Sequence, residues 1–211
     1  GEPNLDWFRE RITRPGMVGL PACPLMHGTG CFTQLIGLSG GGSCVTLESR
    51  TLDVPELLDT IDREGVNLIA IVGDAFAKPI NRTLASSPGT WSLASLMAIT
   101  SSGVMFSEPV KQELLSHATT AMIIDAFSSS EAVGMGQSIS AAGAEVQTAK
   151  FTVGENTRVF DEDGKDVEPG SGQIGRVAVG GFQPIGYYKD EAKSEATFLI
   201  VDGKRYSVPG D

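Results

Sequence analysis

The sequence has few residues of the kinds that build metal clusters, disulfide frameworks or membrane spans. It contains three cysteines and two histidines among 211 residues, and no two cysteines form a Cys-x-x-Cys pair of the type that holds structural zinc. The longest purely apolar stretch, residues 68–72, is far shorter than the roughly 20 residues needed to cross a bilayer. We therefore expect no structural zinc, no disulfide framework and no transmembrane segment. Unpaired cysteines usually pack as small buried hydrophobic residues in proteins of a reducing compartment, so we expect a cytoplasmic protein. Peripheral contact with a membrane stays open.

Positive charge is also scarce. The chain carries 16 Lys and Arg against 26 Asp and Glu, a formal net charge of −10. Such a field repels the phosphate backbone, so nucleic acid is not an expected partner. With 41% hydrophobic residues, the chain is long enough to bury one good core or two small ones.

From residue 17 to residue 127, short apolar runs alternate with longer amphipathic segments. This alternation is typical of strands and crossover helices in a parallel sheet, and near-continuous hydrophobicity indicates strands that are buried on both faces. The sequence therefore predicts an α/β fold with a mostly parallel sheet flanked by helices. The predicted strands are 17–23, 43–47, 66–72, 95–101 and 121–127.

Three helices are indicated between these strands. Asp53 and Glu56 predict a reciprocal capping pair for a helix over 54–64, which Gly65 ends. Ser107, followed by an acidic residue and a proline, predicts the start of a helix that runs to about residue 116. A helix over 75–84 contains Pro79, so it is either kinked at that residue or begins there.

After about residue 148 the pattern changes to short alternating runs separated by glycines, prolines and acidic turns. This pattern predicts part of a small antiparallel β subdomain, with neighbouring strands at 156–160 and 172–179 joined through an Asp-Gly turn at 163–164. The predicted organisation is an α/β domain over 1–148 followed by a partial β domain over 149–211.

Residues 24–30, Pro-Leu-Met-His-Gly-Thr-Gly, leave the first predicted strand through a glycine-containing turn. The imidazole of His27 would face the crevice beyond the carboxyl end of that strand, where open α/β sheets bind ligands. A lone histidine in an apolar stretch is also commonly a packed structural residue, so both interpretations stay open for this motif alone.

Residues 100–107, Thr-Ser-Ser-Gly-Val-Met-Phe-Ser, combine a strand end, a glycine turn and a capped helix start. Gly103 has no Cβ, so the backbone there could approach a flat base or a phosphate closely. An ordinary strand-to-helix turn would show the same signals.

Residues 125–131, Asp-Ala-Phe-Ser-Ser-Ser-Glu, follow the fifth predicted strand. The carboxylate of Glu131 is a hard oxygen ligand that suits magnesium, and the small hydroxyl of Ser130 could reach a phosphate. A serine-rich turn with one acid could equally be a helix cap.

A fourth segment, 172–211, contains Gly-Gln-Ile-Gly, Gly-Gly, Gly-Tyr-Tyr and Ala-Thr-Phe runs and ends in Val-Pro-Gly-Asp. In order and spacing, the four motifs resemble those of the adenylate-forming family of acyl-CoA ligases, luciferases and nonribosomal adenylation domains. The resemblance covers nearly the whole chain. It implies catalytic roles for His27, Ser130 and Glu131, with Glu131 holding Mg2+ as the metal ligand. It implies nucleotide contacts for Ser102, Gly103, Val104, Asp125, Phe127 and Asp211, the last at the ribose.

Several positions depart from the usual family pattern. Ser102, Val104 and Met105 stand where the family has a glycine and an Ala-Pro pair, which puts direct adenine contacts there in doubt. Phe127 and Ser130 replace the usual tyrosine and threonine, and they keep the stacking plane and the hydroxyl.

The resemblance implies an ATP-dependent ligase that activates a carboxylic acid as an acyl-adenylate and transfers it to coenzyme A. The variants at 24–30 and 208–211 most resemble those of bacterial fatty-acid and sterol-side-chain CoA ligases, which favours a hydrophobic acid. Two alternatives remain open: an adenylation module that loads a carrier protein, and a non-catalytic nucleotide-binding or partner-binding fragment.

The family's lysine-bearing phosphate loop should precede residue 24, and no such segment lies between residues 1 and 21. The small domain that brings a second lysine would follow residue 211. We therefore expect a chain truncated at both ends and nearly inactive by itself, with exposed sheet edges that favour association into a homo-oligomer.

One segment imitates a different enzyme class. Residues 37–41, Gly-Leu-Ser-Gly-Gly, fit the Gly-x-Ser-x-Gly pattern of a hydrolase nucleophile elbow. An elbow follows a strand and opens a helix, whereas this run follows a helix-like segment and precedes a strand, so we do not expect a nucleophile at Ser39.

Overall fold

The computed structural model describes residues 4–12, 16–144 and 150–209. The chain divides into two compact units, the first comprising 1–125 and 138–150 and the second 126–137 and 151–211. The segment 126–137 therefore belongs with the later part of the chain, so the two units are not separated by a single boundary in the sequence. The predicted boundary between residues 148 and 149 stays a prediction.

Seven strands form the larger sheet, in the order β2-β1-β3-β4-β5-β6-β7. Strands β1 to β5 pair in parallel, and β6 and β7 pair antiparallel. The predicted mostly parallel sheet is thus confirmed, with each of its five predicted strands present but shorter than its apolar run. The strands are β1 (Val18–Pro21), β2 (Ser43–Cys44), β3 (Leu68–Ile71), β4 (Ala98–Ser101), β5 (Met122–Phe127), β6 (Gly136–Ala141) and β7 (Thr152–Val153).

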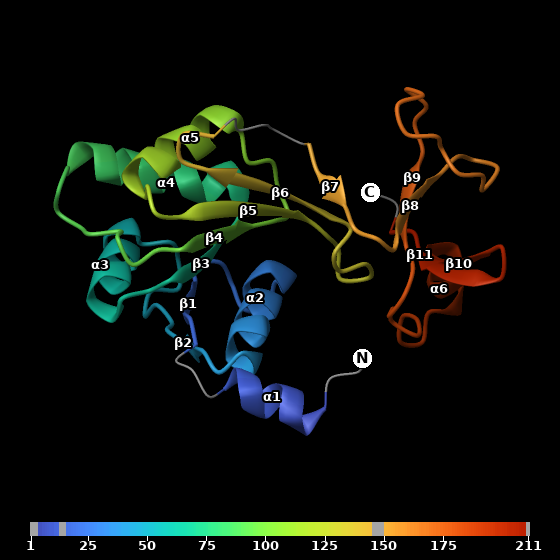
Figure 1. The fold of residues 1–211 in the computed structure, drawn as a ribbon, viewed down its shortest axis with the longest axis horizontal. Helices are drawn as coiled ribbons and strands as arrows, with labels where there is room; N and C mark the ends of the chain where they lie inside the picture. The colour runs from blue at the N-terminus through green and yellow to red at the C-terminus, as the bar shows by residue number, and fades with distance from the viewer. Residues whose placement is uncertain (1–3, 13–15, 145–149, 210–211) are drawn as a thin grey trace. The chain divides into compact units, whose positions relative to one another are not determined.

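The strand order decides where the helices lie. The connection from β1 to β2 runs in one direction along the sheet, and the connections to β3, β4 and β5 run in the other. Because such crossovers are right-handed, they place α2 on one face and α3, α4 and α5 on the opposite face. Figure 1 shows α2 on the other side of the strands from α4 and α5. These helices are α2 (Gly28–Ser39), α3 (Val54–Glu64), α4 (Gly73–Ser86) and α5 (Glu108–His117).

The change of direction between β1 and β3 is a topological switch point. In open α/β sheets, the crevice at the carboxyl ends of the strands beside such a point is where ligands bind. The segments that begin there are therefore the first places to look for a site in this unit.

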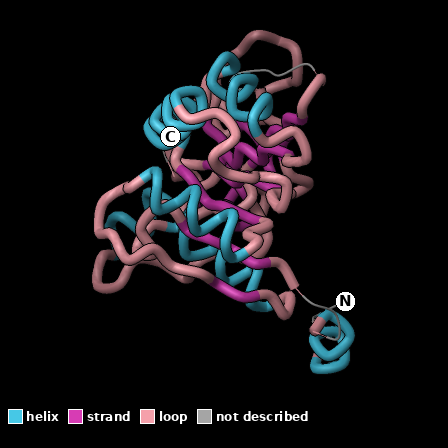
Figure 2. Tube along the Cα trace, turned by 90° about the vertical axis from the view of Figure 1, so that its left-hand side faces the viewer, coloured by secondary structure: helices cyan, strands magenta, loops and turns pink. Residues whose placement is uncertain are grey.

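The core of the first unit lies between the sheet and the layer of α3, α4 and α5. All four residues of β3 are buried, as expected for a strand covered on both faces. Helix α1 (Leu5–Arg11) adds little to this core, since Leu5 is 74% exposed, and Figure 2 shows the helix apart from the others, near the N label. The fully buried large side chains include Leu20, Leu57, Leu58, Ile61, Ile69, Ile71, Leu96, Ile99, Leu114 and Leu115.

Helix α3 shows how local chemistry sets an element's ends. The Asp53 carboxylate accepts a hydrogen bond from the Glu56 amide at 3.1 Å, and Gly65 ends the helix at a φ of 60°. The predicted reciprocal bond from Glu56 is wrong, because its carboxylate accepts instead from the backbone amides of Glu48 at 2.6 Å and Ser49 at 3.3 Å. Helix α4 begins at Gly73 and contains Pro79, so the alternative of a helix beginning at that proline is also wrong.

The second unit contains a four-stranded antiparallel sheet in the order β10-β11-β9-β8, which confirms the predicted small β subdomain. Phe160, Ala178, Tyr206 and Val208 form its buried cluster. The elements are β8 (Thr157–Phe160), β9 (Arg176–Val179), α6 (Glu191–Thr197), β10 (Phe198–Val201) and β11 (Lys204–Ser207).

Among the helices within residues 4–12, 16–144 and 150–209, none combines the length and the apolar character needed to cross a membrane.

Candidate functional site

His27 follows β1 and is the N-cap residue of α2. Its Nδ1 atom accepts a hydrogen bond from the backbone amide of Thr29 at 3.3 Å. This acceptor role requires a lone pair on Nδ1, so the proton of the neutral ring is assigned to Nε2. His27 therefore has a structural role in capping the helix while its other ring nitrogen faces away from the cap.

Gly103 lies beside this histidine. A Cβ added to Gly103 would lie 3.5 Å from Cε1 and 3.8 Å from Nε2 of His27. Gly103 also has a φ of 94°, a conformation that L side chains rarely adopt. The structure thus brings together the first and second predicted motifs at the carboxyl ends of β1 and β4.

We call residues 102–106 the β4–α5 loop. It is bounded by two buried residues: Ser101, which precedes it, is 0% exposed, and Phe106, its last residue, is 1% exposed. Between them, the predicted contact residue Ser102 is half-buried, while Gly103 and Val104 are exposed. The loop is therefore anchored at both ends with an accessible apex, a geometry that can present backbone groups to a ligand.

Gly73 and Asp74, at the start of α4, contact the residues on either side of this loop and were not among the predicted site residues. The Gly73 amide donates to the Ser101 hydroxyl at 2.9 Å, and the Asp74 carboxylate accepts from the Ser107 amide at 2.9 Å. The available sequence signal was a glycine and an acid directly after an apolar strand, where a ligand-facing turn is common.

Asp125 lies at the end of the first unit, and its carboxylate pairs with a buried lysine. Lys111 Nζ lies 2.8 Å from Asp125 Oδ2, and the two side chains are 0% and 8% exposed. The ammonium group also lies 5.4 Å from the centroid of the Phe106 ring. Asp125 therefore links β5 to α5, and a direct nucleotide contact by this residue stays a prediction.

In the second unit, Phe127 lies beside Phe151, with ring centroids 5.6 Å apart. The serine-rich turn that follows is closed locally, since Ser128 Oγ accepts from the Gly134 amide at 3.3 Å. Ser130 is exposed on this turn. No helix begins within residues 128–135, so the helix-cap alternative for this motif is wrong.

Glu131 receives a short hydrogen bond from a residue 56 positions further along the chain. The Tyr187 hydroxyl donates to Glu131 Oε1 at 2.6 Å, and Lys193 Nζ lies 4.2 Å from the centroid of the Tyr187 ring. The hydrogen bond from Tyr187 lowers the pKa of Glu131 despite partial burial, and the charge of Lys193 adds to this effect. The same hydrogen bond raises the pKa of Tyr187.

These contacts fit the predicted metal ligand. The part of the chain that the structure describes contains no group of three or more His, Cys, Asp and Glu side chains placed to hold a metal ion. Magnesium is commonly held by one or two carboxylates, with substrate phosphates and waters completing its shell. A single carboxylate that is kept ionised, as Glu131 is, fits that kind of site.

Asp211, the predicted ribose contact, lies outside the described residues. Ser39 ends helix α2, precedes β2, and donates its hydroxyl to the Leu35 carbonyl at 2.7 Å, so the predicted context of this run, after a helix and before a strand, is confirmed.

The fold is that of adenylation domains. The chain superposes on the crystal structure of CmiS6 with a TM-score of 0.76 and 18% identity, covering 93% of this chain and 49% of that one. It superposes on PA1221, a nonribosomal peptide synthetase protein with adenylation and PCP domains, with a TM-score of 0.75 and 21% identity, covering 93% and 35%. At these identities the likeness shows the fold alone.

The sequence places the chain in a family. The pattern of the family described as AMP-binding enzyme matches residues 5–188, so the chain belongs to that family. It is 34% identical, over 100% of its length, to a medium/long-chain-fatty-acid–CoA/3-oxocholest-4-en-26-oate–CoA ligase of Mycolicibacterium smegmatis, and it covers 39% of that protein. A 3-oxocholest-4-en-26-oate–CoA ligase of Rhodococcus rhodochrous is 38% identical over 96% of the chain, which covers 37% of that protein. The chain thus spans less than two fifths of the length of these relatives.

Proposed function

We propose that the chain supplies the nucleotide-contacting part of an ATP-dependent acid–thiol ligase. The observation that carries the proposal is the 34% and 38% identity, over 100% and 96% of the chain, to two ligases named for joining acids to CoA. In the proposed reaction a carboxylate oxygen attacks the α-phosphorus of ATP, and pyrophosphate leaves. The thiol of coenzyme A then attacks the acyl carbonyl, gives up its proton, and AMP leaves.

The described residues have defined roles in this proposal. The exposed Ser130 hydroxyl donates to the α-phosphate, and the Phe127 ring supplies a flat apolar surface for the adenine. His27 offers the Nε2 proton beside the exposed β4–α5 loop. When magnesium is bound, Glu131 holds it, and the ion offsets negative charge on the phosphates.

The proposed acid is hydrophobic, either a fatty acid or a steroid side-chain acid. Support comes from the names of the two ligases, which carry both classes of acid. The likeness to adenylation domains with a carrier partner concerns the fold alone, so loading of a carrier protein is not favoured over CoA. The three cysteines are free thiols, which suits a reducing compartment, and we place the protein in the cytoplasm.

We further propose that the chain by itself turns over little or no substrate. The lysine-bearing loop of the family is not found between residues 1 and 21, and electrostatic stabilisation of the leaving pyrophosphate depends on such groups. A coupled pyrophosphate-release assay with ATP, Mg2+ and a long-chain acid is expected to show no rate above background. A rate comparable to that of a complete ligase would contradict this.

Binding tests the function without requiring turnover. Calorimetry on the chain should detect a stable acyl-sulfamoyl adenosine, a mimic of the acyl-adenylate. A dodecanoyl mimic is expected to bind at least tenfold more tightly than the acetyl mimic, because it buries more apolar surface. Absence of binding by both mimics would leave only a partner-binding role for the chain, and equal affinity would reject the hydrophobic acid.

A further inference from the structure

The first two residues of α4, Gly73 and Asp74, make contacts at both ends of the β4–α5 loop. At the entry to the loop, the Gly73 amide donates to the Ser101 hydroxyl at 2.9 Å. Near the exit, the Asp74 amide donates to the Met105 carbonyl at 3.2 Å. The loop is therefore tied on both sides to one dipeptide at the switch-point end of the neighbouring strand.

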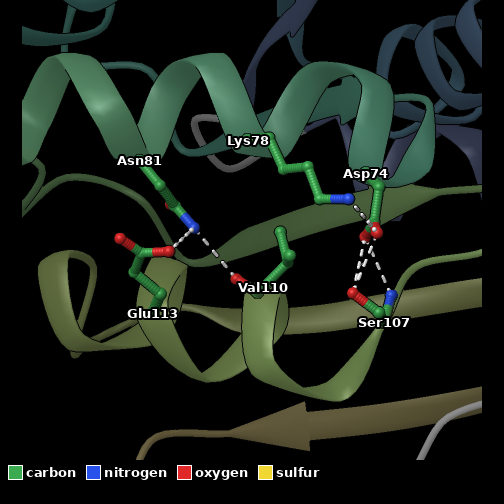
Figure 3. A network of polar contacts seen from close by, with 6 residues as sticks. All are labelled: Asp74, Lys78, Asn81, Ser107, Val110 and Glu113. Atoms are coloured by element: carbon green, nitrogen blue, oxygen red, sulfur yellow. Dashed lines mark hydrogen bonds and ion pairs between the residues drawn. The ribbon is translucent and has the colours of Figure 1, made fainter.

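The side chain of Asp74 extends this tie into helix α5. One of its oxygens accepts from the Ser107 amide at 2.9 Å, and the Ser107 hydroxyl donates to both oxygens, at 3.0 and 2.9 Å. Figure 3 shows these bonds, with Lys78 on the other side of the carboxylate, 3.1 Å from Asp74 Oδ2. Ser107 does not use its hydroxyl to cap its own helix, so the acid of a neighbouring helix orients the start of α5.

The backbone of Gly73 makes a second kind of contact. A Cβ at this position would lie 2.5 Å from the Met105 carbonyl oxygen and 2.7 Å from Val104 Cγ2. The loop therefore lies directly on the glycine, and any side chain there would displace it. Gly73 also has a φ of 47°, which favours glycine.

We infer that Gly73 and Asp74 are positioning residues for the nucleotide, because together they fix the backbone position of the β4–α5 loop and the start of α5. The inference rests on the proposed function and on the nucleotide contacts that the family resemblance implies for Ser102, Gly103 and Val104 of this loop. Neither residue is proposed to touch the nucleotide. They act on the nucleotide through the loop backbone groups that they hold in place, as supporting residues around a preorganised site do.

The molecule offers a matched control for each residue. Asn81 lies on the same face of α4, about two turns from Asp74, and donates to the Val110 carbonyl and to the Glu113 carboxylate, both at 3.1 Å. It therefore ties α4 to α5 as Asp74 does, but away from the loop (Figure 3). Gly65 has a φ of 60° with no atom within 4 Å of an added Cβ, so it carries the same backbone strain without the contact.

The experiment compares two pairs, D74A with N81A and G73A with G65A, in the 211-residue chain. Thermal denaturation is expected to show losses of stability for all four variants. Calorimetry with AMP is expected to show at least tenfold weaker binding for D74A and G73A, and less than threefold change for N81A and G65A. If each control variant weakens AMP binding as much as its partner, the effect is general loosening and the inference is overturned.

The conservative variant D74N separates geometry from charge. Its amide oxygen can still accept from Ser107, so AMP binding is expected to stay within about threefold of the unaltered chain. Affinity as low as that of D74A would show that the negative charge matters and the hydrogen bonds do not, which would overturn the positioning role.

Amide hydrogen exchange without ligand distinguishes failure of the inference from failure of the proposed function. Residues 102–106 are expected to exchange at least tenfold faster in D74A than in N81A. If the unaltered chain does not bind AMP, the proposed function fails, while the exchange comparison still decides whether Asp74 orders the loop. Equal exchange in the two variants would overturn the ordering role directly.

Discussion

Replacing Lys111 by methionine would leave the Asp125 carboxylate buried without its partner. Both side chains lie almost wholly inside the first unit, with the ammonium and carboxylate 2.8 Å apart. Removing one member of such a pair costs about 3–5 kcal/mol, because the remaining charge has lost both water and its counterion. For a chain of this length, about 3 kcal/mol corresponds to a fall of roughly 6–12 °C in melting temperature.

The double variant K111M/D125L gives the opposite expectation. Replacing both members of a buried pair by apolar side chains of similar volume is often neutral, so most of the lost stability should return, to within about 1.5 kcal/mol of the unaltered chain. The variant K78M is the control, since it removes an ion pair whose lysine is 51% exposed. An exposed i,i+4 pair is worth only about 0.3–0.5 kcal/mol.

Urea denaturation followed by tryptophan fluorescence would measure these differences. Both tryptophans, Trp7 and Trp91, belong to the first unit, and Trp91 donates from its indole to Asp59 at 2.6 Å. The signal therefore reports the unit that contains the pair. Two results would refute the reasoning: a K111M variant within about 1 kcal/mol of the unaltered chain, or a double variant no more stable than K111M.

Four other predictions concern the second unit, the loop and the sheet edges. In Y187F, the pKa of Glu131 should rise toward its ordinary value in a carbon-detected NMR titration, and an unchanged value would mean that Tyr187 does not lower it. Because the pKa of Glu131 is lowered by folding, the stability that this bond contributes is fully present above about pH 4.3 and is lost as the pH falls through the lowered value. Urea denaturation at several pH values should therefore show a difference between Y187F and the unaltered chain that shrinks toward acid pH, and a constant difference would contradict this. G103A should lose about 1–2 kcal/mol through its positive φ, measurable by thermal denaturation, whereas a neutral result would mean that the backbone there relaxes freely. Size-exclusion chromatography at rising concentration should show association through the sheet edges, and a constant monomer would exclude it.

The ends of helix α3 were the feature of the fold that the sequence predicted best. Helix α3 runs from Val54 to Glu64 as expected, because an aspartate cap and a left-handed glycine fix its ends independently of distant packing. The strands were predicted too long, because the apolar runs extend beyond the strand residues at one end or at both. The prediction for Glu56 was wrong because of contacts outside the helix. Its carboxylate accepts hydrogen bonds from the backbone amides of Glu48 and Ser49, so it does not accept the capping bond that the local sequence rule predicts.

The sequence named candidate site residues only where they belong to a recognisable motif, and it missed residues that contact those motifs from other parts of the chain. His27 and the β4–α5 loop were both named, and the structure brings His27 and Gly103 together. Lys111 was missed because a lysine on an amphipathic helix reads as a solvated residue, and only the buried Asp125 explains its place. The bond from Tyr187 to Glu131 joins positions 56 residues apart, a distance at which no spacing rule applies.

The order of strands in the larger sheet has a consequence for how the chain folds during synthesis. Strand β1 lies between β2 and β3, and both partners come later in the sequence, so β1 has no neighbour when it leaves the ribosome. About fifty residues separate its end at Pro21 from the end of β3 at Ile71, which at 5–20 residues per second is a wait of roughly 3–10 s. Strand β2 is made within this interval and can pair with one edge of β1, but the edge that β3 covers stays unpaired and available to other chains until β3 is complete. The position that places β1 beside the switch point therefore also leaves one of its edges open to other chains until β3 has been made.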